Sequence, residues 1–338
     1  MCVECVGNSD CGGAKPLCKA GICAAGTWTA QTPLGNGEGS GQDQFKNPMD
    51  VVLSADGLEM YVADGSNARV AVWKRASAGS PWSAQTPIGN GRGANSDQFM
   101  SPAGVTLSLD GLELYVADRE YFDGPARIAV WKRADTTKAW VAQTPIGQDE
   151  EPMEPMGLTL SPDDLELYVA DAENECIAWW TRPDKNSPWT EQPALETGLD
   201  EPEGVTISVD GLTLYIADTD DWEIAVWTRP DTASAWAPAY TIGSGNGQFE
   251  RPARLTVSTD GLDLYVTDPL TDDDNSQVKV WTQPDTASAW ASAYTIGNGR
   301  GSGTNQFDEP QGLTLSPDGL ELYVADKNND RIAVWKYE

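Results

Sequence analysis

Residues 305–335 have the sequence NQFDEPQGLTLSPDGLELYVADKNNDRIAVW, and most of this pattern recurs along the chain. A β-rich run, an Asp-Gly turn and a segment like Leu-x-Leu-Tyr-Val-Ala-Asp occur six times, marked by Tyr61, Tyr115, Tyr168, Tyr215, Tyr265 and Tyr323. Successive marker tyrosines lie 47 to 58 residues apart. Alternating apolar and polar residues indicate strands, and a repeat of this length is typical of a β-propeller with one four-stranded blade per repeat.

Each repeat contains four short strand candidates. In the second repeat they are residues 104–108, 112–118, 127–131 and 140–143. A tryptophan recurs in the third strand and another in the fourth, which favours packing between blades over ligand stacking. One such sheet cannot cover both of its own faces, so the blades are expected to stack on each other.

The two ends of the chain predict how the ring closes. The last repeat stops after its third strand, and the missing tryptophan-bearing strand is found in residues 26–35, GTWTAQTPLG, which match residues 139–147, AWVAQTPIG. We therefore expect an all-β, six-bladed propeller over residues 26–338, with its last blade completed by residues 26–32. Closure removes the exposed sheet edges that invite pairing with other chains.

Residues 95–118, NSDQFMSPAGVTLSLDGLELYVAD, and residues 305–335 resemble the NHL repeat. The likeness rests on the Gln-Phe-x-x-Pro-x-Gly entry and on the loop that follows Tyr-Val-Ala-Asp. It implies a six-bladed propeller, although residues 149–158 and 196–205 lack the Gln-Phe pair. NHL propellers are mostly binding modules with a few enzymes among them, and a fold alone does not decide between these functions.

Residues 1–25 form a separate, cysteine-rich module. A segment this short cannot bury a useful core, so we expect disulfides among Cys5, Cys11, Cys18 and Cys23. Zinc is the alternative, although only Cys2 and Cys5 have a suitable spacing. The segment resembles small repeats of bacterial surface proteins, such as those of myxobacteria, which implies an extracellular or cell-surface location. Cys176 begins a third strand, on the face of the ring opposite the one that residue 26 reaches, so it is expected to be a free thiol.

Composition excludes several classes of function. The 338 residues include 22 Lys and Arg, 52 Asp and Glu and no His, for a net charge of −30. Nucleic acids and anionic membranes need clustered positive charge, so neither partner is expected. Without His there is no Ser-His-Asp triad and no His-ligated metal. No apolar stretch is long enough for membrane insertion.

Two acidic clusters depart from the repeat. Because strands alternate in direction, the loops from second to third strands and from fourth strands to the next first strand lie on the same face of the ring. We call this the upper face, and we expect both clusters to lie on it. The first cluster, with two aromatic residues, is a candidate surface for a protein or glycan partner: Tyr121, Phe122, Asp149, Glu150, Glu151, Glu154, Asp200, Glu201 and Glu203. The second, Asp272, Asp273 and Asp274, is a candidate Ca²⁺ site, since Ca²⁺ prefers oxygen ligands. Solvated surface charge is the alternative for both, and no other cofactor is expected.

These observations predict a non-enzymatic binding or scaffold protein. The alternative is a structural subunit of an extracellular filament or layer, joined through Cys2 or divalent cations. A third hypothesis is a lactonase-like hydrolase with a metal in the central channel. The first-strand entries offer only a mixed set without an oxygen cage: Asp50, Ala103, Met156, Glu203, Arg254 and Gln311. A pocket at the channel mouth holding a carboxylate with a strongly raised pKa would favour the enzyme instead.

Overall fold

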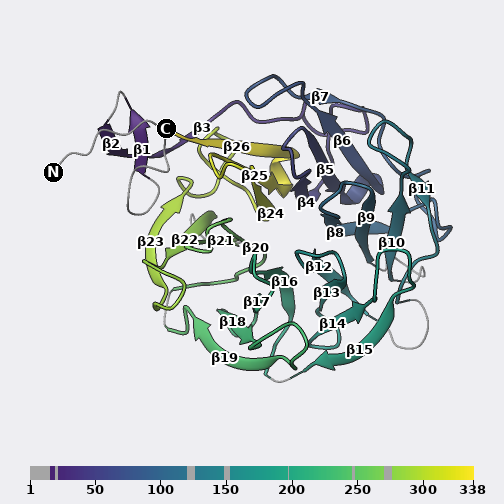
Figure 1. Cartoon of the computed structure of the whole chain (residues 1–338). Helices are drawn as coiled ribbons and strands as arrows, with labels where there is room; N and C mark the ends of the chain where they lie inside the picture. Colours follow the sequence, from purple (N-terminus) through teal and green to yellow (C-terminus); the bar gives the residue numbers. More distant parts are fainter. Residues whose placement is uncertain are drawn as a thin grey trace.

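The computed structural model describes residues 16–19, 22–119, 126–147, 153–196, 198–245, 248–269 and 276–338. Six four-stranded antiparallel sheets surround a central axis, with the first strand of each blade innermost (Figure 1). This confirms the all-β, six-bladed propeller. None of the helices in the described ranges is long and apolar enough to cross a membrane.

The blades follow the chain in order. Blade 1 consists of β4 (Pro48–Leu53), β5 (Glu59–Asp64), β6 (Arg69–Lys74) and β7 (Ser83–Ala84). Blade 2 consists of β8 (Ser101–Leu107), β9 (Glu113–Arg119), β10 (Arg127–Lys132) and β11 (Val141–Ala142). Blade 3 consists of β12 (Pro155–Leu160), β13 (Glu166–Asp171), β14 (Cys176–Thr181) and β15 (Thr190–Leu195).

The second half of the ring has the same plan. Blade 4 consists of β16 (Pro202–Ile207), β17 (Thr213–Asp218), β18 (Glu223–Thr228) and β19 (Ala237–Ile242). Blade 5 consists of β20 (Leu255–Val257), β21 (Asp263–Asp268), β22 (Gln277–Thr282) and β23 (Ala291–Ile296). Blade 6 consists of β24 (Pro310–Leu315), β25 (Glu321–Asp326), β26 (Arg331–Tyr337) and β3 (Trp28–Ala30).

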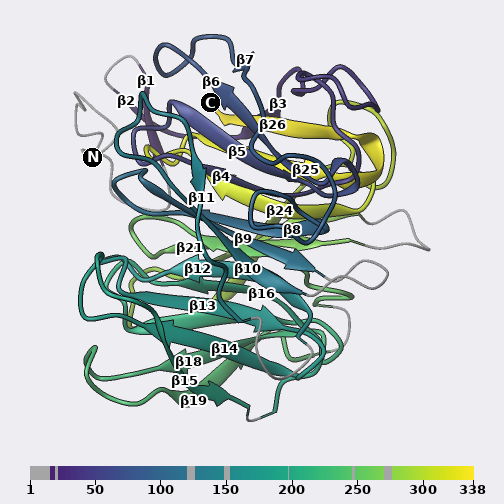
Figure 2. The same cartoon turned by 90° about the vertical axis from the view of Figure 1, so that its right-hand side faces the viewer.

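The ring closes as the sequence predicts. β3 pairs antiparallel with β26, so that Trp28 lies opposite Tyr337. The pairing continues to Leu34, whose N–H donates to the carbonyl of Ile332 at 2.8 Å. Before β3, a hairpin of β1 (Pro16–Lys19) and β2 (Ile22–Ala25) lies outside the ring near the C-terminus (Figures 1 and 2). Cys18 and Cys23 occupy opposite positions in this hairpin, whereas Cys2, Cys5 and Cys11 fall outside the described residues.

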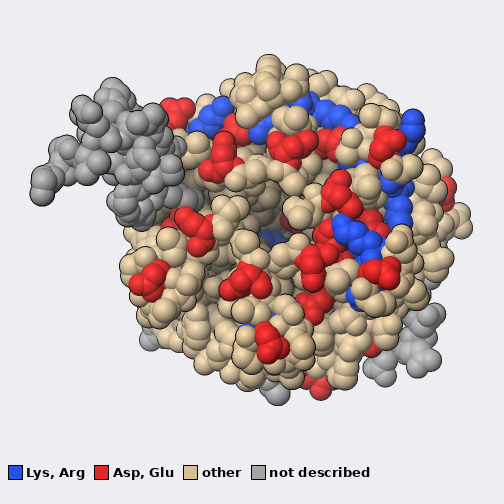
Figure 3. All heavy atoms as spheres, in the orientation of Figure 1, with Lys and Arg blue, Asp and Glu red and all other residues tan. Residues whose placement is uncertain are grey.

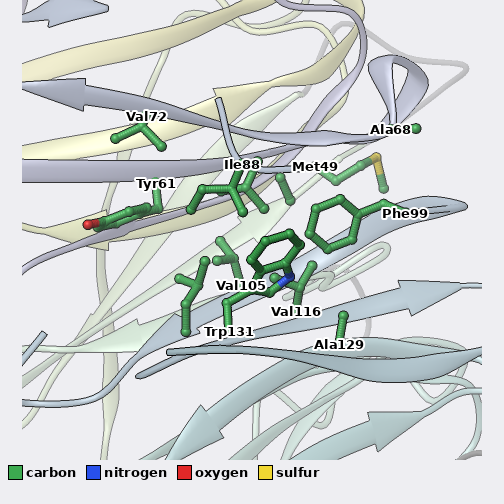
Figure 4. Packing of buried hydrophobic residues seen from close by; sticks show 13 residues of the cluster. Met49, Tyr61, Ala68, Val72, Ile88, Phe99, Val105, Val116, Ala129 and Trp131 are labelled. Carbon is green, nitrogen blue, oxygen red and sulfur yellow. The ribbon is translucent and has the colours of Figure 1, made fainter. Parts of the chain in front are cut away.

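Aromatic rings join every pair of neighbouring blades. The marker tyrosine of one blade meets the fourth-strand tryptophan of the next edge to face, with ring centroids 5.8 to 6.0 Å apart, in Tyr61–Trp140, Tyr115–Trp189, Tyr168–Trp236, Tyr215–Trp290, Tyr265–Trp28 and Tyr323–Trp82. Figure 4 shows the cluster between blades 1 and 2, where Phe99 lies beside Trp131. These contacts confirm that the repeated tryptophans pack between blades.

Buried arginines form ion pairs across four of the six interfaces between blades. These pairs lie on the lower face, which is the face opposite the upper face. Arg133 is typical: its Nη2 lies 2.6 Å from Glu59 of blade 1, and its Nε donates to the carbonyl of Gly111 at 2.7 Å. Its guanidinium also covers the ring of Trp140. The four ion pairs are Arg75–Glu321, Arg133–Glu59, Arg182–Glu113 and Arg229–Glu166. Blade 5 has Gln283 at this position and blade 6 has Tyr337.

Candidate functional site in the central channel

The first strands line the channel and pack closely against each other. After the entry proline, four blades have glycine at the second position: Gly104, Gly157, Gly204 and Gly312. At Gly312 a Cβ would collide with the side chain of Asp50. Blades 1 and 5 instead have Asp50 and Arg254 at this second position, where they are the only charged residues. From the sequence both were expected at the first position, but Met49 and Ala253 occupy it in these two blades.

Asp50 is half-buried on β4, the innermost strand of blade 1. Its Oδ1 accepts the N–H of Val51 at 2.8 Å, and its Oδ2 accepts the N–H of Val105 at 2.9 Å. Burial raises the pKa of this carboxyl to about 6, while the charge of Arg254 and the two N–H donors oppose the shift. Asp50 therefore changes protonation near neutral pH.

Arg254 is 4% exposed and incompletely bonded. Its Nη1 donates to the backbone carbonyl of Glu203, and the same Nη1 lies 3.5 Å from Oε2 of the Glu203 carboxylate. Its Nε and Nη2 have no hydrogen-bond partner within the described part of the chain. Burial lowers the pKa of Arg254, and the charges of Glu203 and Asp50 oppose that effect. Buried donors are nearly always bonded, so two open N–H groups on one guanidinium mark a place for an acceptor.

A pocket of about 270 Å³ opens at the upper end of the channel, and all six blades contribute to its lining. Asp50 and Arg254 are not themselves lining residues: Asp50 follows Met49, which lines the pocket, and Arg254 contacts Glu203, which also lines it. The mouth holds three cations, each with one carboxylate partner: Arg119–Glu154 at 3.2 Å, Arg251–Glu203 at 2.7 Å and Lys327–Glu309 at 3.0 Å. The Nε of Arg119 is also buried without a partner in the described residues. The pocket thus combines three cations, each paired with a carboxylate, with one open donor of Arg119.

The channel is also open on the opposite face of the ring (Figure 3). Figure 3 shows one side of the ring, hollowed at its centre, with Asp and Glu spread around the hollow. Away from the channel, a larger groove of about 1180 Å³ lies between the outer strands of blades 2 and 3, and Cys176 is one of its lining residues. Cys176 is a buried free thiol, as predicted, and burial raises its pKa to about 12. A thiol in this state is a poor nucleophile, so the groove offers no comparable chemistry.

The structure separates the residues of the first acidic cluster. Glu203 lies in the channel pocket and Glu154 lies at its rim, while Asp200 and Glu201 belong to the edge of blade 4. The other members fall outside the described residues, as does the candidate Ca²⁺ site: Tyr121, Phe122, Asp149, Glu150, Glu151, Asp272, Asp273 and Asp274. Over the described ranges, no three acidic or cysteine side chains are close enough to hold a metal ion.

Sequence reasoning missed Arg119 and Arg251. Both flank strand ends that converge on the channel mouth, a placement that becomes visible only when the blades are assembled. Asp50 and Arg254 gave a clearer signal, since each replaces a glycine that the other repeats carry at the same position.

The NHL repeat model matches residues 307–335. No curated protein matches the chain. Among solved structures, the periplasmic gluconolactonase of Pseudomonas aeruginosa is similar, with 16% identity, a TM-score of 0.61 and coverage of 92% of each chain. A structure from Bacteroides uniformis named for 6-phosphogluconolactonase has 16% identity, a TM-score of 0.64 and the same coverage. Another with that name, from Bacteroides fragilis, has 15% identity, a TM-score of 0.62 and covers 92% of this chain and 91% of its own.

At this level of identity the likeness shows the fold alone, and the chain is a six-bladed β-propeller with an NHL repeat. The comparison nevertheless corrects the expected function. A non-enzymatic binding scaffold or structural subunit was predicted, and it is contradicted by lactonase names on structures that match nearly the whole chain. The prediction failed because the first-strand residues were weighed mainly as a metal cage, whereas the raised pKa of Asp50 and the open donors of Arg254 depend on the assembled channel.

Proposed function

We propose that the chain is a lactonase-like hydrolase that acts in the central channel without using an oxygen cage for a metal. The observation that carries this proposal is the combination of Asp50, whose pKa is raised to about 6, with the two open donors of Arg254, which contacts Glu203 in the lining of a pocket built by all six blades. The gluconolactonase names of the structural neighbours support a sugar lactone as the substrate class.

The two side chains can divide the work of lactone hydrolysis. Ionised Asp50 takes a proton from a water molecule as its oxygen attacks the lactone carbonyl carbon. Negative charge then develops on the carbonyl oxygen, where the Nε and Nη2 groups of Arg254 can donate hydrogen bonds. When the ring C–O bond breaks, the proton on Asp50 passes to the departing ring oxygen, which gives a hydroxy acid. General base catalysis of this kind contributes about 10² to 10⁴ in rate.

The charges at the channel mouth are compatible with the release of an anionic product. A protein with a net charge of −30 would repel a sugar acid. At the channel mouth, Arg119, Arg251 and Lys327 balance the carboxylates with which they pair, so this opening does not add to the repulsion.

The test is a panel of sugar, aliphatic and aromatic lactones, assayed by acid release. We expect saturable hydrolysis of at least one sugar lactone, and Asp50→Asn should lower kcat/KM by about 10² to 10⁴. Asp231→Asn is the matched control, because Asp231 is exposed on a lower-face turn and bonds only within that turn. The proposal is wrong if no lactone is hydrolysed faster than without protein, or if Asp50→Asn is as active as the wild type.

A further inference from the structure

Each blade has a buried aspartate at the end of its second strand, or one residue before it in blade 2, and in four blades a cation bonds it. The Nε of an arginine lies 2.7 to 3.1 Å from Oδ2 in blades 1, 2 and 6, and in blade 5 the Nζ of a lysine lies at 2.6 Å: Arg69–Asp64, Arg127–Asp118, Arg331–Asp326 and Lys279–Asp268. In blade 3 an amide takes the place of the cation: the Nδ2 of Asn174 donates a hydrogen bond to Oδ2 of Asp171 at 2.8 Å. Five of the six blades thus place a donor at this oxygen.

Blade 4 is the exception. Asp218 is fully buried, and its Oδ1 accepts the N–H of Asp200 at 2.7 Å. Its Oδ2 has no hydrogen-bond partner in the parts of the chain that the structure describes. The position directly across the strand pair, which is arginine in blades 1, 2 and 6, is Glu223. The position three residues after the aspartate, which is Asn67 in blade 1, is Asp221.

Carboxylates therefore stand where the other blades have donors. Burial raises the pKa of Asp218 to about 7, and the charges of Asp221, Glu223 and Asp200 add to the shift. The pKa of neighbouring Glu201 is also raised, first by the charge of Asp220. Like charges directly opposite each other destabilise a strand pair, so a cation or a proton bound at this corner of the blade would stabilise it.

We propose that Asp218 of blade 4 is the buried ligand of a Ca²⁺ site, in which the ion takes the place of the arginine or lysine found in four other blades. Asp220 and Asp221, which follow Asp218 closely along the chain, are exposed. No three acidic side chains of the described ranges form a ready cage. The ion would accordingly complete its oxygen shell with carbonyls and water, and we expect the roughly 10⁻⁴ to 10⁻³ M affinity of extracellular Ca²⁺ modules.

The proposal is tested on the full chain by calorimetric titration with CaCl₂ and by thermal unfolding in CaCl₂ or EDTA. We expect a heat of binding and a rise in Tm with Ca²⁺. Asp218→Asn should lose both responses, whereas Asp231→Asn should keep them. Glu223→Arg should supply the missing cation from within the chain, as Arg331 does for Asp326, so that Tm rises without Ca²⁺ and the response to Ca²⁺ disappears.

Two results would overturn the site. One is the absence of heat and of a Tm shift in the wild type at millimolar Ca²⁺, and the other is an unchanged response in Asp218→Asn. A proton is the competing occupant: if stability falls as pH rises from about 4 towards about 7 and Ca²⁺ does not restore it, Asp218 is simply protonated and binds no ion. Lactone hydrolysis is a separate readout and should be unchanged in Asp218→Asn.

Discussion

Arg133 and Arg254 are both buried arginines, yet they differ in what surrounds them. Arg133 is bonded to a glutamate and a carbonyl and stacks on a tryptophan, and three other blades repeat the arrangement. Arg254 occurs once, replaces a glycine of the repeat, and leaves two donors without partners in the described structure. Repeated positions therefore build the ring, while departures from the repeat build the site.

The largest expected effect on stability is at the lower face. Arg133→Met leaves Glu59 buried with only Lys74 and Tyr61 as partners, so we expect a loss of about 3 kcal/mol in the free energy of unfolding. Denaturant titration measures the loss, and lactone hydrolysis per folded molecule should not change. A loss below about 1 kcal/mol would show that the repeated arginines do not hold the blades together.

The pH dependence of catalysis comes next. Asp50 must be ionised to accept a proton, and its pKa is about 6. We therefore expect kcat/KM to fall about tenfold for each pH unit below 6 and to level off above it. Residual activity of Asp50→Asn should lack this transition; a wild-type rate that is flat between pH 4 and 7 would remove Asp50 as the base.

The smallest effect is expected where the arginine contacts are missing. Thr213 and Gln283 occupy the positions of the Glu–Arg pair between blades 4 and 5. Thr213→Glu combined with Gln283→Arg should stabilise the chain by up to about 1 kcal/mol beyond the sum of the two single changes. A double-mutant cycle with no coupling would show that the missing pair cannot simply be transferred.

Much of the fold could be predicted from the sequence because the repeat specifies it. The closing strand was visible in residues 26–35, and the recurring tryptophans indicated where blades meet. The site was harder for a physical reason. First strands begin with a shift in register, as between Pro48 and Asp50, so the sequence does not tell which residue points into the channel. The open donors of Arg254 depend on neighbours from other blades, and no local pattern reports them.

The most direct test measures activity and stability together in Arg254→Met. Glu203 keeps Arg251 as its partner, and the change removes a buried charge with two unbonded donors. We predict that kcat falls about 10² to 10³-fold while the free energy of unfolding stays the same or rises. A loss of about 3 kcal/mol in stability with unchanged activity per folded molecule would contradict the account, because Arg254 would then be one more arginine that supports the ring.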